Sequence, residues 1–294
     1  MKVLVTGGTG FIGSYVCDVL LGRGCEPLVF DRQAGRPRYA GAANVILGDV
    51  RDPVAVTEAV AHADAVIHLA GVLGTQETVG NPRPAAETNV LGSLNVFEAV
   101  AQYQLPAVYI CVGNWWEQNS YSITKTCAER FAVMFNRERG TRISAVRAMN
   151  AYGPRQVPAA PFGPSKVRKI MPAFICRALT GQPLEVYGDG EQVMDMVHAA
   201  DVAGALVEEL FSPSGLDTPR VVGTGARTTV NDIAEMVCRA AGQGEIVHVP
   251  LRPGESPGAE VLAPERRYDF VQLQAGTFET VEWFRERWLP TWRS

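Results

Sequence analysis

Hydrophobic runs without polar alternation recur along the first half of the chain, as expected for strands buried on both faces of a sheet. These runs lie at residues 2–6, 26–31, 44–49, 64–71, 107–113 and 142–150. Between several of them, apolar residues recur at helical spacing, over residues 11–24, 52–63, 81–104 and a long segment that opens near residue 119. The repeated strand–helix–strand order predicts an α/β fold with a doubly wound parallel sheet, that is, a Rossmann fold.

The second half of the chain has a different pattern. After Gly153 the alternation stops and prolines recur at every third or fourth position up to residue 164. We therefore expect a dinucleotide-binding Rossmann domain over residues 1–155. Residues 156–294 are expected to form mainly a smaller C-terminal substrate-binding lobe, with some segments returning to the Rossmann sheet.

Composition and charge exclude several classes of protein. The chain is 47% hydrophobic and 20% charged, with a net charge of −4, whereas a nucleic-acid-binding surface normally needs a basic excess. No apolar run approaches the length of about 18 residues that a membrane span requires. Glycines at positions 7 and 8 interrupt the N-terminal apolar run before a signal-peptide core could form. We expect a cytoplasmic protein with neither a nucleic-acid nor a membrane partner.

The cysteines and histidines do not indicate a metal site. The six cysteines are scattered without a C-x-x-C pair, and the four histidines lack metal-ligand spacing. Reduced thiols are expected for this compartment. His68, inside an apolar run, is predicted to be a packed strand residue.

A glycine-rich segment, TGGTGFIGS, directly follows the first expected strand and opens the first expected helix. Gly7 permits a tight turn, Gly10 a close approach of the backbone to a pyrophosphate, and Gly13 close packing of helix on strand. Phe11 and Ile12 complete this loop. Asp31 ends the next strand, where an acidic residue hydrogen-bonds the hydroxyls of an adenosine ribose. The spacing predicts a bound dinucleotide.

The residues after the second strand bear on which dinucleotide binds. The Asp31 carboxylate would repel a 2′-phosphate, which favours NAD over NADP. Arg32 stands next to it and could accommodate that phosphate, so NADP remains the less favoured alternative.

Tyr121 and Lys125 stand four residues apart at the start of an expected helix, so their side chains share one face. The pair is either a phenol tuned by a neighbouring ammonium or two polar residues on a helix surface. Taken alone the spacing occurs often by chance, so the rest of the sequence has to decide between the two.

Several further motifs follow in a fixed order. They are GDVRD at residues 48–52, VIHLAG at 66–71, TNVLGSLNV at 88–96 and RAMNAYGPRQ at 147–156. With the glycine-rich segment, Asp31 and the Tyr121/Lys125 pair, the chain resembles the extended short-chain dehydrogenase/reductase superfamily, most of all its NAD-dependent nucleotide-sugar epimerases and dehydratases. The resemblance continues through PLEVYGDGEQ at residues 183–192 and ADVAGALVEEL at 200–210.

The resemblance implies a bound NAD, a nucleoside-diphosphate sugar in a cleft between the lobes, and a homodimer formed through the long helices at 84–103 and 120–138. It implies that Asp49 and Val50 line the adenine and that Asn89 lies in the nicotinamide region. The middle of the cofactor would contact Leu69, Ala70 and Gly71. The sugar nucleotide and its phosphates would face Asn150, Arg155 and Arg252, with Lys166, Arg168 and Lys169 as a further phosphate-binding cluster or merely a solvated helix face.

In the same family the tyrosine acts as the base, with the lysine beside it holding the nicotinamide ribose. Lowering the pKa of Tyr121 from about 10 to near neutrality requires about 4 kcal/mol of preferential stabilisation of the phenolate. The Lys125 ammonium and a positive nicotinamide ring could supply it. The resemblance therefore favours the chemical interpretation of the pair.

The chain departs from the family pattern at the end of the fifth strand. Gly113 stands where the family places a Ser or Thr that hydrogen-bonds the reacting sugar oxygen, and loss of such a donor typically costs about 10²–10³ in rate. Asn114, Ser120 or a water substitutes for it, or the reaction is slow or altered. The acid pair of dehydratases is absent, which leaves Glu117 as the only acid in the region. Cys111 is expected to be a buried thiol rather than a nucleophile.

Two other departures affect substrate binding. Met194 stands where the family often has an arginine that reaches the sugar pyrophosphate, so Arg252, Arg155 or the Lys166 cluster would have to compensate. Trp115 and Trp116 fill the shortened loop and either stack on a sugar or nucleobase or seal a cleft or interface.

The leading hypothesis is an NAD-dependent nucleotide-sugar epimerase acting at C4 by transient hydride abstraction and return. Tyr121, Lys125 and Asn114 are its candidate catalytic residues. An NAD(P)H-dependent keto-sugar reductase and a nucleotide-sugar dehydratase are the alternatives among enzymes. The alternative that is not primarily an enzyme is a catalytically reduced NAD-binding regulatory protein.

Overall fold

The computed structural model describes residues 1–34, 44–251 and 269–293. The chain divides into two compact units, which are described separately. The sheet unit comprises Met1–Ala148 and Ala199–Val222, and the second unit comprises Met149–His198 and Gly223–Ser294. Residues 199–222 thus return to the sheet unit after the chain has left it.

The sheet unit is built on seven parallel strands in the order β11-β6-β5-β4-β1-β2-β3. These strands are β1 (Lys2–Thr6), β2 (Glu26–Asp31), β3 (Asn44–Leu47), β4 (Ala65–His68), β5 (Pro106–Val112), β6 (Arg142–Ala148) and β11 (Arg220–Val222). The predicted doubly wound parallel sheet is confirmed. The strand order reverses at β1, which lies between β2 and β4, and ligands of such sheets bind at the carboxyl ends beside this switch point.

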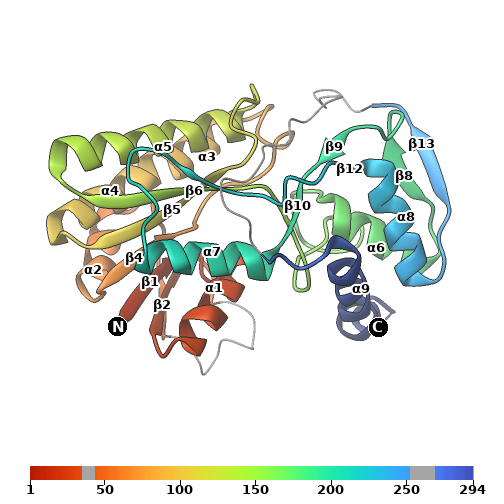
Figure 1. Ribbon diagram of the computed structural model, residues 1–294, viewed down its shortest axis with the longest axis horizontal. Coiled ribbons are helices and arrows are strands. Elements are labelled where there is room, and N and C mark those ends of the chain that lie inside the picture. Colours follow the sequence, from red (N-terminus) through yellow and green to blue (C-terminus); the bar gives the residue numbers. More distant parts are fainter. Residues whose placement is uncertain (35–43, 252–268, 294) are drawn as a thin grey trace. The chain divides into compact units, whose positions relative to one another are not determined.

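Helices cover both faces of this sheet (Figure 1). On one face α1 (Phe11–Gly22) packs against α7 (Ala199–Phe211), and on the other lie α2 (Pro53–Ala61), α4 (Gly92–Tyr103) and α5 (Ser120–Arg139). Asp52 caps α2, because its side chain accepts hydrogen bonds from the backbone N–H groups of Val54 and Ala55. The first residue of α2 is Pro53, close to the start of the helical segment expected at residues 52–63.

The helix expected over residues 81–104 consists of three continuous pieces. These are α3 (Arg83–Ala85), the π-helical turn η2 (Ala86–Leu91) and α4. A π-helical turn widens the helix locally and is often found at functional sites. Here it carries Asn89, which is fully buried.

The core of the sheet unit is filled from both sides. Strand residues such as Leu4, Val66 and Tyr109 meet helix residues such as Phe97 and Phe135, and all five are completely or almost completely buried. The apolar runs noted in the sequence are therefore buried as expected for parallel strands.

The second unit has its own core and three small two-stranded pairings. Its strands pair as β7 (Asn150–Tyr152) with β10 (Met196–His198), β8 (Leu184–Tyr187) with β13 (Ile246–Val249), and β9 (Val193–Met194) with β12 (Thr228–Thr229). Its helices are α6 (Ile170–Thr180), α8 (Val230–Ala241), α9 (Leu273–Trp283), η3 (Phe284–Trp288) and α10 (Leu289–Arg293). Tyr152, Ile175 and Phe284 lie at the centre of this core.

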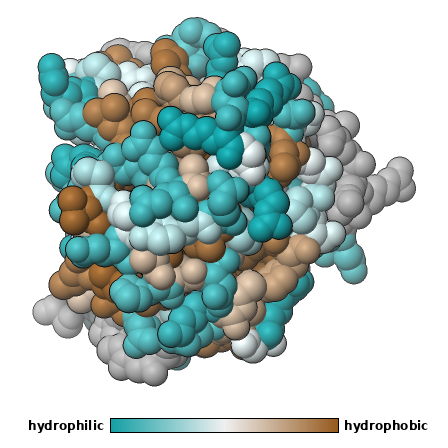
Figure 2. Space-filling model, turned by 90° about the vertical axis from the view of Figure 1, so that its left-hand side faces the viewer, coloured by the Kyte–Doolittle hydropathy of each residue, from teal (hydrophilic) through white to brown (hydrophobic). Residues whose placement is uncertain are grey.

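The described residues show no membrane-spanning helix, metal site or disulfide bond. Among the described residues, no helix is both long and apolar enough to cross a membrane, and no group of side chains could hold a metal ion. All six cysteines are free, and four of them are buried. On the side shown in Figure 2, hydrophobic residues are interspersed with hydrophilic ones.

Candidate active site

The glycine loop (residues 7–13) connects β1 to α1 at the switch point of the sheet. Gly7 has φ +71°, a left-handed conformation that glycine adopts without strain. A Cβ added at Gly13 would lie 2.3 Å from the Gly7 carbonyl oxygen, and one added at Gly7 would lie 2.8 Å from the backbone nitrogen of Ala70. The loop therefore folds as tightly as a backbone allows and leaves no room for side chains at these positions.

The N-terminus of α1 is open to an anion. Gly10 is the N-cap residue, and among the described residues no side chain caps this helix and no acidic residue occupies its first turn. Phe11 and Ile12, which begin the helix, are half-buried. An uncapped helix N-terminus behind a glycine turn favours a phosphate, because its N–H groups and dipole both attract negative charge.

Asp31 lies beside the glycine loop, at the end of β2. Its Oδ2 accepts hydrogen bonds from the Thr9 hydroxyl at 2.7 Å and from the Thr9 N–H at 3.2 Å. The carboxylate is half-buried, whereas Arg32 next to it is exposed. The structure thus brings the predicted acid to the predicted loop.

The ends of β3 and β4 complete this edge of the sheet. Asp49 is bound by the Arg51 guanidinium at 2.7 Å, and this hydrogen bond is the main reason that the pKa of Asp49 is lowered. Val50 is buried against Gly92. Leu69 and Ala70 donate backbone N–H groups to the Thr6 hydroxyl, each at 3.2 Å.

Asn89 braces the segment that follows β4. Its Oδ1 accepts from Val72 N–H at 2.7 Å, and its Nδ2 donates to the Val72 carbonyl at 3.0 Å and to the Thr124 hydroxyl at 3.1 Å. A Cβ at Gly71 would lie 3.0 Å from the Asn89 Oδ1. Asn89 therefore fixes residues 71–72 and links them to α5.

Tyr121 and Lys125 lie in the first two turns of α5, one turn apart on one face. Asn119 caps the helix by accepting a hydrogen bond from Ser122 N–H at 2.9 Å. Lys125 is only 3% exposed, and its ammonium lies 4.2 Å from the centre of the Tyr109 ring. Such a cation–π contact favours the charged form of the amine.

The expected lowering of the Tyr121 pKa is not found in the chain itself. Burial, with a smaller contribution from Cys111, raises the pKa of Tyr121 to about 12. Burial likewise lowers the pKa of Lys125 to about 8, an effect that the nearby Glu129 carboxylate partly opposes. At neutral pH the amine is therefore still mostly an ammonium, and the phenol keeps its proton until a ligand changes its surroundings.

The clamp loop (residues 113–119) connects β5 to α5. Gly113 is buried and offers no donor side chain, as the sequence indicates. The Glu117 carboxylate accepts a hydrogen bond from the Asn114 amide at 3.0 Å through Oε1 and from the Asn119 amide at 2.7 Å through Oε2. Glu117 thereby ties the end of β5 to the cap of α5.

Two residues to which the sequence analysis gave no role, Arg147 and Glu129, support this region. Arg147 on β6 makes a two-pronged ion pair with the buried Glu129 of α5, at 2.6 and 2.9 Å. The same guanidinium lies 4.7 Å from the centre of a Trp115 ring. Glu129 follows Lys125 by four residues, and this spacing was a signal that could have placed it on the Tyr121 face.

Cys111 and His68 have structural surroundings. Burial raises the pKa of the Cys111 thiol well above its usual range, which disfavours a nucleophilic thiolate. His68 is 1% exposed, and its ring nitrogens lie 2.6 Å from the Thr6 hydroxyl and 2.9 Å from the Ser93 hydroxyl. Burial lowers the pKa of His68 to about 3, so it is neutral at physiological pH.

The residues expected to face a sugar nucleotide lie in the second unit. Asn150 on β7 donates to the Asp195 carbonyl, and Arg155 adopts φ +74°, a strained conformation for a residue with a side chain. Arg168 donates to the Tyr187 hydroxyl at 2.6 Å, and Lys166 is exposed. Arg252 lies outside the described residues.

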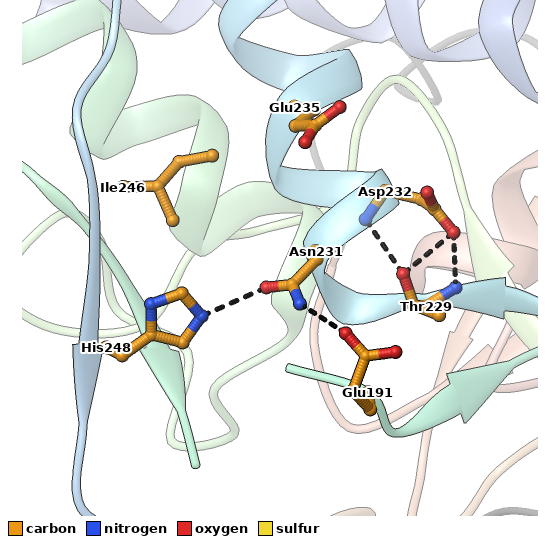
Figure 3. Close-up of a pocket in the computed structure, with 7 residues that line it drawn as sticks. All are labelled: Glu191, Thr229, Asn231, Asp232, Glu235, Ile246 and His248. Carbon is orange, nitrogen blue, oxygen red and sulfur yellow. Dashed lines mark hydrogen bonds between the residues drawn. The ribbon is translucent and has the colours of Figure 1, made fainter. Parts of the chain in front are cut away.

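Another part of the second unit contains a shallow polar hollow of about 560 Å³ (Figure 3). Asn231 lies at its centre. Its side-chain NH₂ group donates a hydrogen bond to Glu191 at 2.9 Å, and its Oδ1 lies 3.1 Å from the His248 Nε2. Thr229 and Asp232 form the capping box of α8. The polar side chains of the hollow that form hydrogen bonds in Figure 3 therefore have partners within the hollow itself.

Comparison with known proteins agrees with this geometry. The model of a family described as the NAD dependent epimerase/dehydratase family matches residues 3–225. A UDP-glucose 4-epimerase from Thermus thermophilus, solved in complex with NAD, is 31% identical with a TM-score of 0.87, and the match covers 98% of this chain and 100% of that one.

Two relatives by sequence have different activities. A dTDP-glucose 4,6-dehydratase from Streptomyces niveus is 27% identical over 330 residues, covering 99% of this chain and 95% of the relative. A putative UDP-glucose 4-epimerase from Methanocaldococcus jannaschii is 28% identical over 275 residues, covering 86% and 87%. Overall similarity therefore does not separate epimerisation from dehydration.

Proposed function

The chain belongs to the NAD dependent epimerase/dehydratase family, and within this family we propose that it is a nucleotide-sugar epimerase acting at C4. Family membership confirms three predictions: the resemblance to the extended short-chain dehydrogenases/reductases, an NAD-dependent enzyme, and NAD as the cofactor. The choice of epimerisation over dehydration depends on the residues of the clamp loop.

The residues of the sheet unit fit NAD. Gly7, Gly10 and Gly13 leave the backbone bare beside the open end of α1, where a pyrophosphate would be held. Asp31 would bind the adenosine ribose, and Lys125 the nicotinamide ribose. When bound, NAD supplies a positively charged ring and the reversible two-electron oxidation of the sugar.

The observation that carries the proposal is that both carboxylate oxygens of Glu117 already accept hydrogen bonds. Between Gly113 and Tyr121 it is the only acidic residue, and both of its oxygens accept hydrogen bonds from asparagine amides. Elimination of water needs an acid to protonate the leaving hydroxyl and a base to remove the neighbouring proton. This loop offers no further carboxyl for those steps, whereas epimerisation at C4 needs only one group that takes and returns a hydroxyl proton.

Tyr121 is that group in our proposal. Its Oη takes the proton of the C4 hydroxyl as the sugar is oxidised. The keto-sugar then turns over, so that the opposite face of C4 is reduced, and Tyr121 gives the proton back to the new hydroxyl from the same position. The Lys125 ammonium stabilises the phenolate that Tyr121 must be before it takes this proton and after it returns it, because an adjacent positive charge opposes the effect of burial. Asn114 is the proposed donor to the sugar oxygen in place of the family's Ser or Thr.

The substrate is proposed to be a nucleoside-diphosphate sugar bound by Asn150, Arg155 and Arg252, with Lys166 and Arg168 as phosphate contacts. The strained backbone of Arg155 supports a functional role for this residue, since such conformations cluster at ligand sites. We further propose a cytoplasmic homodimer formed through α4 and α5. Ile123 and Met134, exposed apolar residues on α5, support that surface.

The test uses purified protein with NAD and a panel of UDP-, dTDP- and GDP-sugars. We expect interconversion of one C4 epimer pair, and a fall in kcat of about 10²–10⁴-fold in Tyr121→Phe, the range for loss of a general acid–base group. Tyr103→Phe, at an exposed tyrosine at the end of α4, should match the wild type.

Other outcomes identify the alternatives. Release of a 4-keto-6-deoxy sugar would show a dehydratase, and net consumption of NADPH would show a keto-sugar reductase. Tight NAD binding without turnover of any sugar nucleotide would indicate a regulatory protein.

A further inference from the structure

The clamp loop is organised around one carboxylate. Glu117 accepts from Asn114 with one oxygen and from Asn119 with the other, over distances of 3.0 and 2.7 Å. Asn114 follows the end of β5, and Asn119 is the cap of α5, the helix that carries Tyr121 and Lys125. A single side chain therefore connects the strand end to the start of the catalytic helix.

The orientation of both amides follows from this arrangement. A carboxylate only accepts hydrogen bonds, so each asparagine must turn its NH₂ group toward Glu117. The Oδ1 of Asn119 then faces the helix, where it accepts from Ser122 N–H at 2.9 Å. Asn114 keeps one further N–H for another acceptor, because its amide carries two donor hydrogens.

A second contact holds the same loop to the same helix. The Trp115 ring lies over the Arg147 guanidinium, which is paired with Glu129 on the Tyr121–Lys125 face of α5. The backbone closes the turn as well, since Trp115 N–H donates to the Gly113 carbonyl at 3.0 Å. The loop is therefore held from two sides, and Glu117 is the part that contacts both asparagines.

We propose that Glu117 is a positioning residue for catalysis, which holds the Asn114 amide and the first turn of α5 in the geometry that the reaction needs. This inference rests on the proposed function, because positioning has a kinetic meaning only if Tyr121 and Asn114 act on a substrate. Glu117 acts through these neighbours and takes no proton itself. It compensates for Gly113 by orienting an amide where relatives carry a hydroxyl.

The key variant is Glu117→Gln, which has nearly the same shape. A glutamine side chain has one oxygen and one NH₂ group, so it can accept a hydrogen bond from only one of the two asparagines. At the other asparagine two NH₂ groups would face each other, and neither can accept. Asn119→Ser should remove the contact with Glu117 while keeping the cap of α5. Serine is an equally good N-cap residue, but it cannot reach Glu117 as the asparagine amide does. Glu58→Gln, at an exposed position on α2, is the matched control because it lies outside both the clamp loop and the proposed dimer surface.

We expect kcat of Glu117→Gln and of Asn119→Ser to fall about 10- to 100-fold, the effect of misplacing reacting groups by about 1 Å, with KM and NAD affinity nearly unchanged. Amide hydrogen exchange at Ser122 should quicken about 10-fold in Glu117→Gln, since its cap is less restrained. Glu58→Gln should leave kcat and Ser122 exchange at wild-type values.

The outcomes separate this inference from the proposed function. If the wild type converts no sugar nucleotide, the proposed function fails, and the clamp is judged by Ser122 exchange and by NMR titration of the Tyr121 phenol, both of which should change in Glu117→Gln. If the wild type is active, an unchanged kcat in Glu117→Gln overturns the inference. An equal loss in Glu58→Gln, or a loss that appears only as lower stability or weaker NAD binding, overturns it as well.

Discussion

The glycine loop and the clamp loop both follow parallel strands at the carboxyl edge of the same sheet, yet they are held in different ways. The glycine loop is shaped by missing side chains, and a Cβ at Gly13 would lie 2.3 Å from a backbone oxygen. The clamp loop is shaped by side chains that are present, with Glu117 bound to two asparagines and Trp115 over Arg147.

The two loops should therefore differ in how well they tolerate amino-acid substitutions. A loop made by close backbone contacts cannot accept a larger residue without moving the backbone, because packed atoms yield little. A loop made by hydrogen-bonded side chains can be rebuilt with other partners, provided that each buried polar group is satisfied. We therefore expect mutations in the two loops to differ in size of effect and in the step that they impair.

The largest effect is expected for Gly13→Ala. Its Cβ would meet the Gly7 carbonyl and the Gly8 Cα, so the loop must open and the protein should lose about 3 kcal/mol of stability. NAD affinity should fall by about 100-fold, as followed by calorimetric titration. Gly22→Ala at the end of α1 is the control, since no atom lies within 4 Å of its added Cβ. Equal NAD affinity in both variants would show that close backbone contact does not shape the glycine loop.

The next effect concerns Lys125, on the helix that follows the clamp loop. Burial lowers its pKa from 10.5 to about 8, which corresponds to a cost of about 3 kcal/mol for the buried ammonium. Lys125→Met should therefore be more stable than the wild type at pH 7 by up to that amount, while losing activity. The measurement is urea unfolding between pH 7 and pH 10.5.

The stability difference between Lys125→Met and the wild type should depend on pH. Below pH 8 the lysine is charged in both the folded and the unfolded chain, so the cost of burying it is fully present. Between pH 8 and 10.5 only the unfolded chain binds the proton, so wild-type stability rises relative to the variant. The advantage of Lys125→Met should accordingly shrink over this range. Lys2→Met, at an exposed lysine, should show no such trend.

The smallest effect is expected for Trp115→Ala. Trp115 is 43% exposed, and a cation–π contact at such a site is worth about 0.5–1 kcal/mol. Thermal unfolding should show a loss of that order, with NAD affinity unchanged. Val79→Ala removes a similarly exposed apolar side chain and should cost less. A loss above about 3 kcal/mol in Trp115→Ala would mean that the clamp loop is a rigid core element like the glycine loop.

The sequence predicted the parts of the site that depend on backbone geometry and local spacing. Gly7 and Gly13 have a fixed spacing because a side chain at either position would meet backbone atoms, and Asp52 with Pro53 marks the start of α2 through local hydrogen bonds. Both features are set within a few residues, so a sequence pattern records them directly.

The features that the sequence did not reveal depend on contacts between distant residues. Arg147 and Glu129 are 18 residues apart, and their pairing with Trp115 depends on the packing of β6, α5 and the clamp loop. The high pKa of Tyr121 reflects how many atoms surround the phenol, which the spacing to Lys125 does not show. The π-helical turn at Ala86–Leu91 similarly has no marker such as proline or glycine.

The late return of residues 199–222 has a consequence for biosynthesis. These residues supply α7, which packs on α1, and β11, which pairs with β6, so a ribosome must pass residue 222 before the sheet can gain its seventh strand. Until then the nascent N-terminal half exposes an apolar helix face and an unpaired strand edge, the surfaces that chaperones recognise and that promote aggregation.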